Sequence, residues 1–177
     1  KENFPITGTK LHPVFIKNLA KIKRAAAITN RKAGRLKPEI ANAIEASANE
    51  VICGMFDKDF IVDGIQGGAG TSANMNMNEV IANRAIEMLC GKKGDYTIVH
   101  PNDHVNMAQS TNDVIPTAGK LTVLDLLKPL DKSLSLLTDA LYDKAAAFDH
   151  IVKIGRTQLE DAVPMRLGQT FHSYATM

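Results

Sequence analysis

The chain has 177 residues, of which 45% are hydrophobic, 23% are charged and only 5% are aromatic. This composition excludes disordered, collagen-like and disulfide-scaffold proteins, and it allows a sizeable core. The formal net charge of +2 is small and the charges are scattered, so they indicate neither a nucleic-acid partner nor an anionic membrane surface. Because burial has to come from Ala, Leu, Ile, Val and Met, which helices tolerate well, we expect a mainly α fold.

The two cysteines, Cys53 and Cys90, lie far apart in apolar stretches and form no CxxC or Cys/His pattern. We therefore expect buried, unpaired thiols in a reducing compartment. The sequence has no apolar run of the ~18 residues that a membrane span needs, and its N-terminus lacks the layout of a secretory signal. These features predict a cytoplasmic protein with no membrane partner.

Two helices are predicted near the N-terminus. The first begins at Pro13, which suits the first turn of a helix, and ends at Gly34. The second begins near Pro38 and ends near Gly54, and we expect it to pack on the first because the connection is short. The apolar stripe of the first helix advances by three or four residues at each step: Phe15, Leu19, Ile22 and Ala26.

A glycine-rich loop at residues 67–72 leads into a third predicted helix, which stops near Gly91. Upstream of this loop, the alternation of Phe60 and Val62 predicts a short extended segment. Glycines let backbone N–H groups approach a ligand, and hydroxyls beside a positive helix end add further donors. The loop is either an anion site formed by Gly70, Thr71 and Ser72 or simply a flexible entry to the helix.

Residues 91–112 are polar and irregular, a length at which a loop is often functional. His100, Asp103 and His104 lie within five residues of one another, which suggests a metal site, but Pro101 and the lack of another strong ligand argue against zinc. We expect no bound metal. The alternatives are a hydrogen-bonded loop and a second, weak anion site at His100, Asn102 and Asp103.

A long helix is predicted from residue 113 to 148, roughly 54 Å at 1.5 Å per residue, with a bend or break at Pro129. At its start, Ser110, Thr111 and Asn112 can cap the helix or donate to a bound carboxylate. The rest of the chain is too short to cover its apolar side, so we expect packing in a bundle with other subunits. This side, the leucine seam, has nearly coiled-coil spacing and consists of Leu127, Leu130, Leu134, Leu137, Leu141, Ala145 and Phe148.

After the long helix, residues 151–158 are predicted to be extended or looping, residues 159–164 to form a loop, and Leu167 to begin another helix. Thr157 and Gln158 could orient a polar substrate, whereas Arg156 could be an ordinary ion-pair partner. Both ends look cut, since the chain has no initiator Met and stops inside an apolar pattern, so we expect a piece of a longer protein. We predict an N-terminal helical domain at 1–109 and the beginning of a truncated central helical-bundle domain at 110–177.

Four stretches taken together resemble the aspartase/fumarase superfamily in their amino-acid sequence and in their order along the chain: residues 67–85, 100–106, 110–113 and 155–159. The resemblance runs over essentially the whole chain. It implies a mainly α fold, in which an N-terminal helical domain precedes a bundle of long helices. It also implies a lyase that acts on a small dicarboxylate or amino-acid substrate without a cofactor, as a homotetramer with active sites shared between subunits.

Within the superfamily, the loop Gly-Gly-Ala-Gly-Thr-Ser and the sequence Ser110-Thr111-Asn112 resemble aspartate ammonia-lyases. Class II fumarases typically have a Gly-Ser-Gly-Thr loop, Ser-Ser-Asn, and a His where this chain has Gln158. The stretch His100-Pro101-Asn102-Asp103 instead resembles the peripheral anion site of fumarases, so class II fumarate hydratase is an alternative. An alternative of another class is a non-catalytic helical oligomerisation module, which the leucine seam favours.

The implied reaction is anti elimination of ammonia from L-aspartate to give fumarate. Its difficulty is a carbanion beside a carboxylate, which hydroxyl and backbone donors at helix N-termini can stabilise as a dianionic aci-form. The family takes its general base from a serine on a mobile Gly-Ser-Ser loop, a tripeptide that the 177 residues lack, so we expect this chain alone to be inactive. The resemblance assigns the reacting carboxylate to Thr71, Ser110 and Thr111, the ammonium to Asn112 and Gln158, the other carboxylate to Thr157, and further substrate contacts to Gly70 and Ser72.

Overall fold

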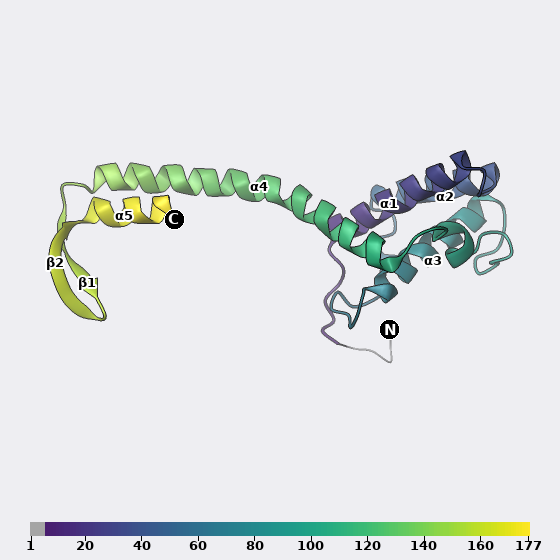
Figure 1. The fold of residues 1–177 in the computed structure, drawn as a ribbon, viewed down its shortest axis with the longest axis horizontal. Coiled ribbons are helices and arrows are strands. Elements are labelled where there is room, and N and C mark those ends of the chain that lie inside the picture. The colour runs from purple at the N-terminus through teal and green to yellow at the C-terminus, as the bar shows by residue number, and fades with distance from the viewer. Residues whose placement is uncertain (1–5) are drawn as a thin grey trace. The chain divides into compact units, whose positions relative to one another are not determined.

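The computed structural model describes residues 6–177, which are mainly α-helical, as predicted. The chain divides into two compact units, one ending at Asp125 and the other spanning Leu126–Met177, which are described one at a time. The predicted domain division at 1–109 and 110–177 stays a prediction. The α-helices labelled in Figure 1 are α1 (Pro13–Lys32), α2 (Pro38–Ile52), α3 (Thr71–Met88), α4 (Thr111–Ala147) and α5 (Leu167–Thr176).

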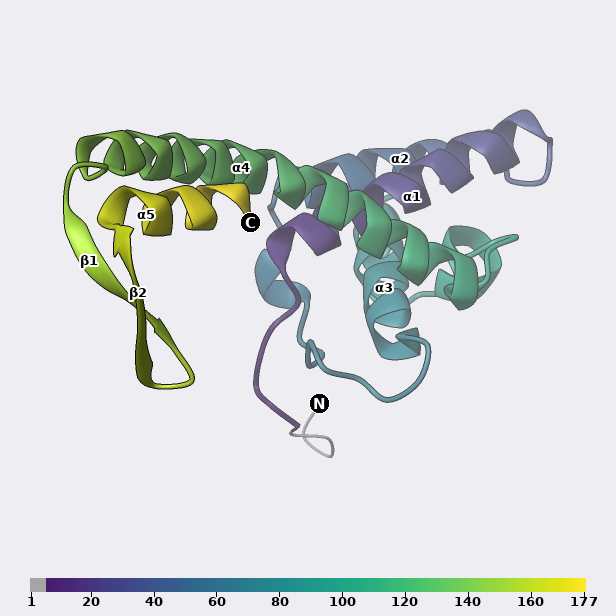
Figure 2. The ribbon, with the colours of Figure 1, turned by 60° about the vertical axis from the view of Figure 1, so that its left-hand side comes forward.

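In the first unit, α1 and α2 lie side by side, as Figures 1 and 2 both show. Pro13 and Pro38 each occupy the first turn of their helix, where the missing N–H costs no hydrogen bond. The His12 side chain caps α1 by accepting a hydrogen bond from the backbone N–H of Val14 at 3.2 Å. Beyond the end of α1, Gly34 takes the left-handed conformation with φ +70°. Both predicted helices are therefore confirmed.

The core of the first unit forms where α2 packs between α1 and α3. Leu19, Ile44, Met77 and Ile81 are completely buried there. The predicted stripe of α1 is confirmed at Leu19, and its members Phe15 and Ile22 are partly buried against the core. The most deeply buried face lies about one position further along, because the neighbouring residues are also apolar. The buried residues of α1 are Ile16, Asn18, Leu19, Ala20, Lys23, Ala27 and Asn30.

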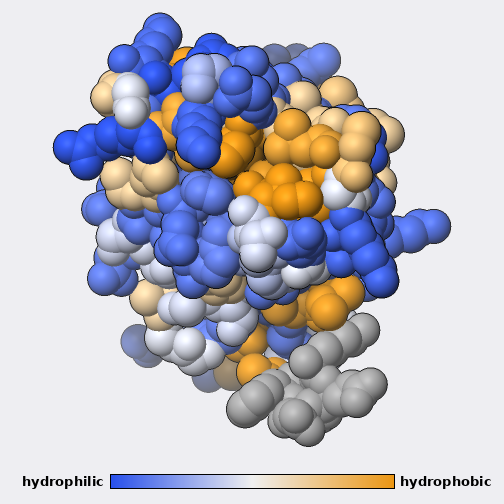
Figure 3. Space-filling model, turned by 90° about the vertical axis from the view of Figure 1, so that its right-hand side faces the viewer, coloured by the Kyte–Doolittle hydropathy of each residue, from blue (hydrophilic) through white to orange (hydrophobic). Residues whose placement is uncertain are grey.

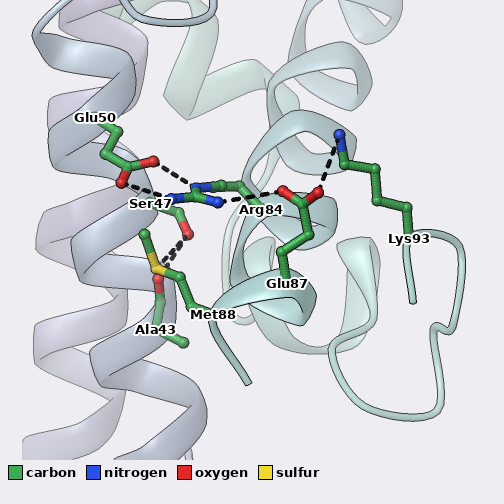
Figure 4. Close-up of polar contacts among 7 residues, drawn as sticks. All are labelled: Ala43, Ser47, Glu50, Arg84, Glu87, Met88 and Lys93. Atoms are coloured by element: carbon green, nitrogen blue, oxygen red, sulfur yellow. Dashed lines mark hydrogen bonds and ion pairs between the residues drawn. The ribbon is translucent and has the colours of Figure 1, made fainter. Parts of the chain in front are cut away.

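Polar side chains also connect α2 with α3 (Figure 4). The Arg84 guanidinium donates to both carboxylate oxygens of Glu50, at 2.6 and 2.9 Å, and to Glu87 at 3.3 Å. Hydrogen bonding from Arg84 lowers the pKa of the Glu50 carboxyl. Lys93, which follows α3, lies 3.2 Å from Glu87 and extends the network. These contacts fix the register of the two helices beside the apolar core.

No strand is assigned at residues 60–62, where a short extended segment was expected; next to them, Asp63 forms an isolated antiparallel bridge with Lys10. A 3-10 turn, Asp57–Asp59, precedes them. The Asp63 carboxylate accepts hydrogen bonds from the backbone of Thr7, Gly8 and Ile65 and from the Thr7 hydroxyl, all at 2.7 to 2.8 Å. Donors from Ile65 and Thr7 lower the pKa of Asp63 to about 2. A side chain, and not a second strand, therefore organises this segment.

The expectation of buried thiols is wrong, because Cys53 and Cys90 are both exposed, although both are unpaired. Each cysteine lies just beyond the last turn of a helix. Cys53 is the C-cap of α2, and Cys90 follows α3 with φ 61°. At a helix end the chain leaves the packed face, so the helical period no longer predicts burial.

In the second unit, β1 (Val152–Thr157) and β2 (Glu160–Arg166) form an antiparallel hairpin. The predicted extended stretch is confirmed, but the predicted loop at 159–164 is wrong, because most of it is β2. Gln158 and Leu159 alone make the turn, with φ of 48° and 65°. Two successive left-handed residues match the twist of a tight hairpin. Pro164 is tolerated because β2 is an edge strand.

Helix α4 continues through Pro129 without the break that the proline made possible. Within the second unit, α5 packs on the C-terminal end of α4 (Figure 2). The Phe148 and Phe171 rings lie 5.4 Å apart there. Gly168 permits this close packing, since a Cβ at that position would overlap the Ala145 carbonyl. The helix predicted from Leu167 is therefore confirmed.

Several large apolar side chains are exposed. The face drawn in Figure 3 shows apolar side chains at the surface among hydrophilic ones. In the second unit the exposed residues include four leucines of the leucine seam, with exposed fractions of 46% at Leu127, 51% at Leu130, 52% at Leu134 and 56% at Leu137. Leu136, which lies off the seam, is 63% exposed. None of the helices in residues 6–177 is long and apolar enough to cross a lipid bilayer.

Candidate functional site

The glycine-rich loop ends at Gly70, which is the N-cap of α3. Gly70 has φ +80°, and a Cβ there would lie 3.1 Å from Ile115 Cγ2 on α4. Glycine thus serves two purposes, the left-handed turn and the close approach of α3 to α4. One backbone N–H of the first turn, at Ala73, donates to Gln66 Oε1 at 3.2 Å. Thr71 and Ser72 begin the helix and are exposed.

Helix α4 begins next to the start of α3. Ser110 caps it: its backbone carbonyl accepts from the N–H groups of Asp113 and Val114, and its hydroxyl accepts from the Asn112 N–H at 3.2 Å. Thr111, the first residue of α4, is half-buried, and its hydroxyl accepts a hydrogen bond from Asn74 Nδ2 at 3.2 Å. The first turns of α3 and α4 are therefore joined by the contact of Gly70 with Ile115 and by the hydrogen bond from Asn74 to Thr111. We refer to the place where these two first turns meet as the corner.

A network of hydrogen-bonded polar groups lies on the interior side of the corner. Lys23 Nζ donates to Asn106 Oδ1 at 2.8 Å, and Asn74 Nδ2 donates to the same oxygen at 3.2 Å. The Asn106 amide donates in turn to the Gln109 carbonyl at 3.1 Å. Lys23 is fully buried on α1, and desolvation lowers its pKa from 10.5 to about 7. The chain of contacts therefore runs from α1 through the loop before α4 to the starts of α3 and α4.

Several hydroxyl groups on other parts of the helices donate to a backbone carbonyl of their own helix. The hydroxyls of Thr29, Ser47 and Thr122 donate to the carbonyl four residues earlier in their own helix, at 2.7 to 2.9 Å. In contrast, Ser110 and Thr111 use their hydroxyls as acceptors, and the Thr71 hydroxyl has no partner within residues 6–177. A hydroxyl has one donor hydrogen, so within residues 6–177 the hydrogens of Ser110, Thr111 and Thr71 have no acceptor and remain able to donate.

The electrostatics of the corner suit an anion. Two helix N-termini meet there, each with a partial positive charge from backbone N–H groups. The first turn of α3 has no acidic residue, whereas that of α4 has Asp113. Hydroxyl and N–H donors of this kind can hold a carboxylate and stabilise negative charge that develops on it.

The loop before α4 has its own hydrogen bonds. Residues Pro101–Val105 form a π-helical turn, and His100 Nδ1 accepts from the backbone N–H groups of Asn102 and Asp103 at 3.2 and 3.1 Å. His104 Nδ1 accepts from the His100 N–H at 2.9 Å, and desolvation lowers the pKa of His104. The hydrogen-bonded loop is therefore present. A second anion site at His100, Asn102 and Asp103 stays a prediction.

Thr157 and Gln158 lie in the second unit, at the turn of the hairpin, and both are exposed. Thr157 pairs with Glu160, and Arg156 lies 3.5 Å from Asp161, so Arg156 has the ion-pair partner that was one of its two interpretations. The site geometry described for the first unit includes neither Thr157 nor Gln158. Among residues 6–177, no cluster of three or more His, Cys, Asp and Glu side chains could hold a metal ion.

Comparison with known proteins identifies the family of the chain. The family described as "Lyase" matches residues 1–177, the whole chain. The chain belongs to the aspartase/fumarase superfamily of lyases. Aspartate ammonia-lyase of Bacillus subtilis is 53% identical over 98% of this chain and 37% of its own length.

Other members of the superfamily are similar to the same degree. Fumarate hydratase class II of Halobacterium salinarum is 53% identical over 99% of this chain and 37% of its own length. A crystal structure of fumarate lyase:delta crystallin from Brucella melitensis superposes with a TM-score of 0.88 at 47% identity, over 99% of this chain and 41% of that one. The chain spans about 37% of the length of the curated relatives it matches. Identity alone therefore shows the superfamily and leaves the substrate undecided.

The sequence predicts the residues at the surface of the candidate site. It does not predict the residues that form the hydrogen-bond network beneath them, Lys23, Asn74 and Asn106. Lys23 could have been found, because it stands four residues after Leu19 and four before Ala27, on the buried face of α1. A lysine on such a face needs a polar partner. Asn74 alternates with Asn76 and Asn78 in the sequence, a pattern that assigns no role to any of them, and its pairing with Asn106 has no local signal.

Proposed function

We propose that the complete protein carrying this chain eliminates ammonia from L-aspartate to give fumarate. The observation that carries the proposal is the meeting of two helix N-termini, those of α3 and α4, where the hydroxyl hydrogens of Thr71, Ser110 and Thr111 have no acceptor among residues 6–177. Membership of the superfamily and the aspartate ammonia-lyase relatives support the same activity.

The chemistry follows from where charge develops. A base removes a proton from the carbon beside one carboxylate, and the electron pair of that C–H bond moves onto the carboxylate as an aci-dianion. The pair then forms the carbon–carbon double bond while the C–N bond breaks and ammonia leaves with the bonding electrons. Thr71, Ser110 and Thr111 donate to the carboxylate whose charge increases, and fixed donors of this kind lower the barrier because they are oriented before the reaction.

Other residues orient the rest of the substrate in this proposal. Asn112 and Gln158 bind the ammonium group and Thr157 binds the second carboxylate, while Gly70 and Ser72 complete the loop around the first. The base is a serine on a Gly-Ser-Ser loop, a tripeptide that the 177 residues do not contain. The 177-residue chain by itself should therefore release no ammonia.

We propose that the complete protein is a cytoplasmic homotetramer whose active sites are shared between subunits. The exposed leucine seam of α4 supports assembly, since Leu127, Leu130 and Leu134 are 46–52% exposed. Contiguous apolar side chains on one helix face are typical of a surface that packs against another helix. In this arrangement the hairpin residues Thr157 and Gln158 serve a site built with other subunits.

Class II fumarate hydratase is the second candidate function. Two observations favour it: the fumarate hydratase relative matches the chain at 53% identity, and His100-Pro101-Asn102-Asp103 resembles the peripheral anion site of fumarases. The elimination then removes water from malate in place of ammonia from aspartate. The same carboxylate-binding corner serves both reactions, so the leaving group decides between them.

The test is to assay the complete protein with L-aspartate and with L-malate in parallel, following ammonia release in the first reaction and fumarate formation in both. Ammonia release with little turnover of malate supports the proposal. Turnover of malate alone establishes the hydratase alternative. A folded, oligomeric protein that acts on neither substrate contradicts both and favours a non-catalytic helical assembly module.

A further inference from the structure

Asn74 is a buried asparagine in the first turn of α3. It lies behind the exposed residues at the start of this helix. Its side chain is 1% exposed, and its Nδ2 group donates both to Asn106 Oδ1 and to Thr111 Oγ1, each at 3.2 Å. The Asn74 Oδ1 atom is buried without a hydrogen-bond partner among the described residues, so the two bonds of Nδ2 alone define the orientation of this amide. Asn74 therefore contacts the Thr111 hydroxyl from within the protein, while Thr111 itself is only half-buried.

The orientation of the Asn106 amide is fixed by two independent partners. The Gln109 backbone carbonyl can only accept, so Asn106 has to present its NH2 group there, at 3.1 Å. Lys23 Nζ donates to the other end, Asn106 Oδ1, at 2.8 Å. A flipped Asn106 amide would place an oxygen against a carbonyl and an NH2 group against the lysine, and would lose both hydrogen bonds.

The orientation of Asn74 follows from that of Asn106. Because Asn106 presents an oxygen, Asn74 has to present its Nδ2 group, and the same group faces Thr111 Oγ1. The Thr111 oxygen then accepts, so its own hydrogen cannot be used on Asn74. An asparagine oxygen in this place would instead attract the Thr111 hydrogen away from a ligand.

We propose that Asn74 is a positioning residue, held by Asn106 and Lys23, that keeps the Thr111 hydroxyl as a donor toward the reacting carboxylate. This inference rests on the proposed function, in which Thr111 stabilises the aci-dianion. Asn74 does not touch substrate. It acts through Thr111 alone.

The experiment compares two buried asparagines of α3 in the complete protein. Asn74→Leu removes the donor to Thr111 while Asn106 Oδ1 keeps Lys23. Asn78→Leu is the matched control: Asn78, one turn later, is also fully buried, and its Nδ2 reaches only Met75 Sδ, at 3.5 Å. We expect Asn74→Leu to lower kcat about tenfold or more with a small change in KM, because the lost interaction matters most in the transition state. Asn78→Leu should change thermal stability by a similar amount but leave kcat within about twofold.

A double-mutant cycle with Thr111→Val separates positioning from a general structural effect. If Asn74 acts through Thr111, Asn74→Leu should cost no further activity once the hydroxyl is gone. Full additivity of the two losses overturns the inference, as does unchanged kcat in a folded Asn74→Leu protein. Asn74→Asp covers the case in which the leucine variant does not fold: it keeps the shape, replaces the donor by an acceptor, and should lower kcat at least as much.

The wild-type assay distinguishes failure of the positioning role of Asn74 from failure of the proposed function. Wild-type turnover of aspartate or malate combined with an additive cycle rejects the role of Asn74 and leaves the proposed function standing. A folded wild-type protein that acts on neither substrate rejects the proposed function, and the positioning role with it.

Discussion

The two compact units use similar apolar residues in opposite ways. In the first unit, Leu19, Ile44 and Ile81 are completely buried, whereas in the second unit Leu130 and Leu134 are more than half exposed. Both sets recur with helical spacing, so the pattern that builds a core inside the first unit presents a surface in the second. The first unit therefore buries its apolar side chains in a core, whereas the second unit leaves a row of leucines on α4 exposed.

The largest predicted effect tests this difference in burial directly. Ile81→Ala should lower the free energy of unfolding by about 2–5 kcal/mol, because it leaves a cavity in a packed core. Leu134→Ala should change it by less than about 0.5 kcal/mol in the dilute chain, since an exposed side chain leaves no cavity. Urea denaturation of the two variants and the wild type measures both values.

Leu134→Ala also reports on assembly. At concentrations where sedimentation shows the protein to be oligomeric, Leu134→Ala should lower the free energy of unfolding by more than it does in the dilute chain. The reason is that the leucine is then buried against another subunit. Equal losses for both variants in a dilute, monomeric sample would contradict the comparison, since Leu134 would then be covered within the chain.

The difference between the units also explains how far the sequence predicts the fold. Strongly periodic segments with proline at the start and glycine after the end gave α1 and α2 nearly residue by residue. The strand β2 could not be predicted because Leu159–Pro164 has weak alternation and contains a proline, and its pairing depends on the turn at Gln158 and Leu159. The two cysteines were misplaced because a helical period carries no information beyond the last turn.

The candidate site was predictable on its exposed side only. Glycines and hydroxyls at helix starts are local patterns, so Thr71, Ser110 and Thr111 could be named from the sequence. Their support could not, because Asn106 is 32 residues from Asn74 and 83 residues from Lys23 along the chain. Such contacts arise only when α1, α3 and the loop before α4 pack together.

The next prediction separates stability from turnover within the first unit. Thr71→Val in the complete protein should lower kcat by roughly 10²-fold, the cost of losing one donor to a developing negative charge. Its thermal stability should hardly change, because the Thr71 hydroxyl is exposed and has no partner within residues 6–177. Thr29→Val on α1 is the control, since the Thr29 hydroxyl is occupied by the Ala25 carbonyl at 2.9 Å. A Thr71→Val protein that unfolds would show that the loop is structural.

A smaller effect concerns the pH dependence of stability and comes from Lys23. Burial lowers its pKa to about 7 from 10.5, so between these values the unfolded chain binds more protons than the folded one. The contribution of Lys23 therefore makes the free energy of unfolding rise from pH 7 toward 10.5, with the full penalty of desolvation present below pH 7. Lys23→Met removes the charge and should flatten this rise.

Urea midpoints at pH 7 and pH 9 measure the effect of Lys23→Met, with Lys17→Met, an exposed lysine on the same helix, as the control. We expect the wild type and the control to gain stability between the two pH values and the Lys23 variant to gain less. An identical gain in all three proteins would mean that Lys23 is hydrated in solution, and that the buried side of the junction is looser than the core around it.

The smallest predicted effect lies in the second unit and is the absence of a new activity. Gln158→His places the residue typical of fumarases at the hairpin turn, where the side chain is exposed and substitution should leave stability within about 0.5 kcal/mol. Activating water requires an imidazole whose proton passes to a relay partner, and one substitution at Gln158 supplies only the imidazole. The complete variant should therefore produce no fumarate from malate beyond the wild-type rate, with a class II fumarase as the positive control. Malate turnover that appears with this single change would mean that the relay is already in place, and that the residue at position 158, not the carboxylate-binding corner of the first unit, decides between ammonia and water as the leaving group.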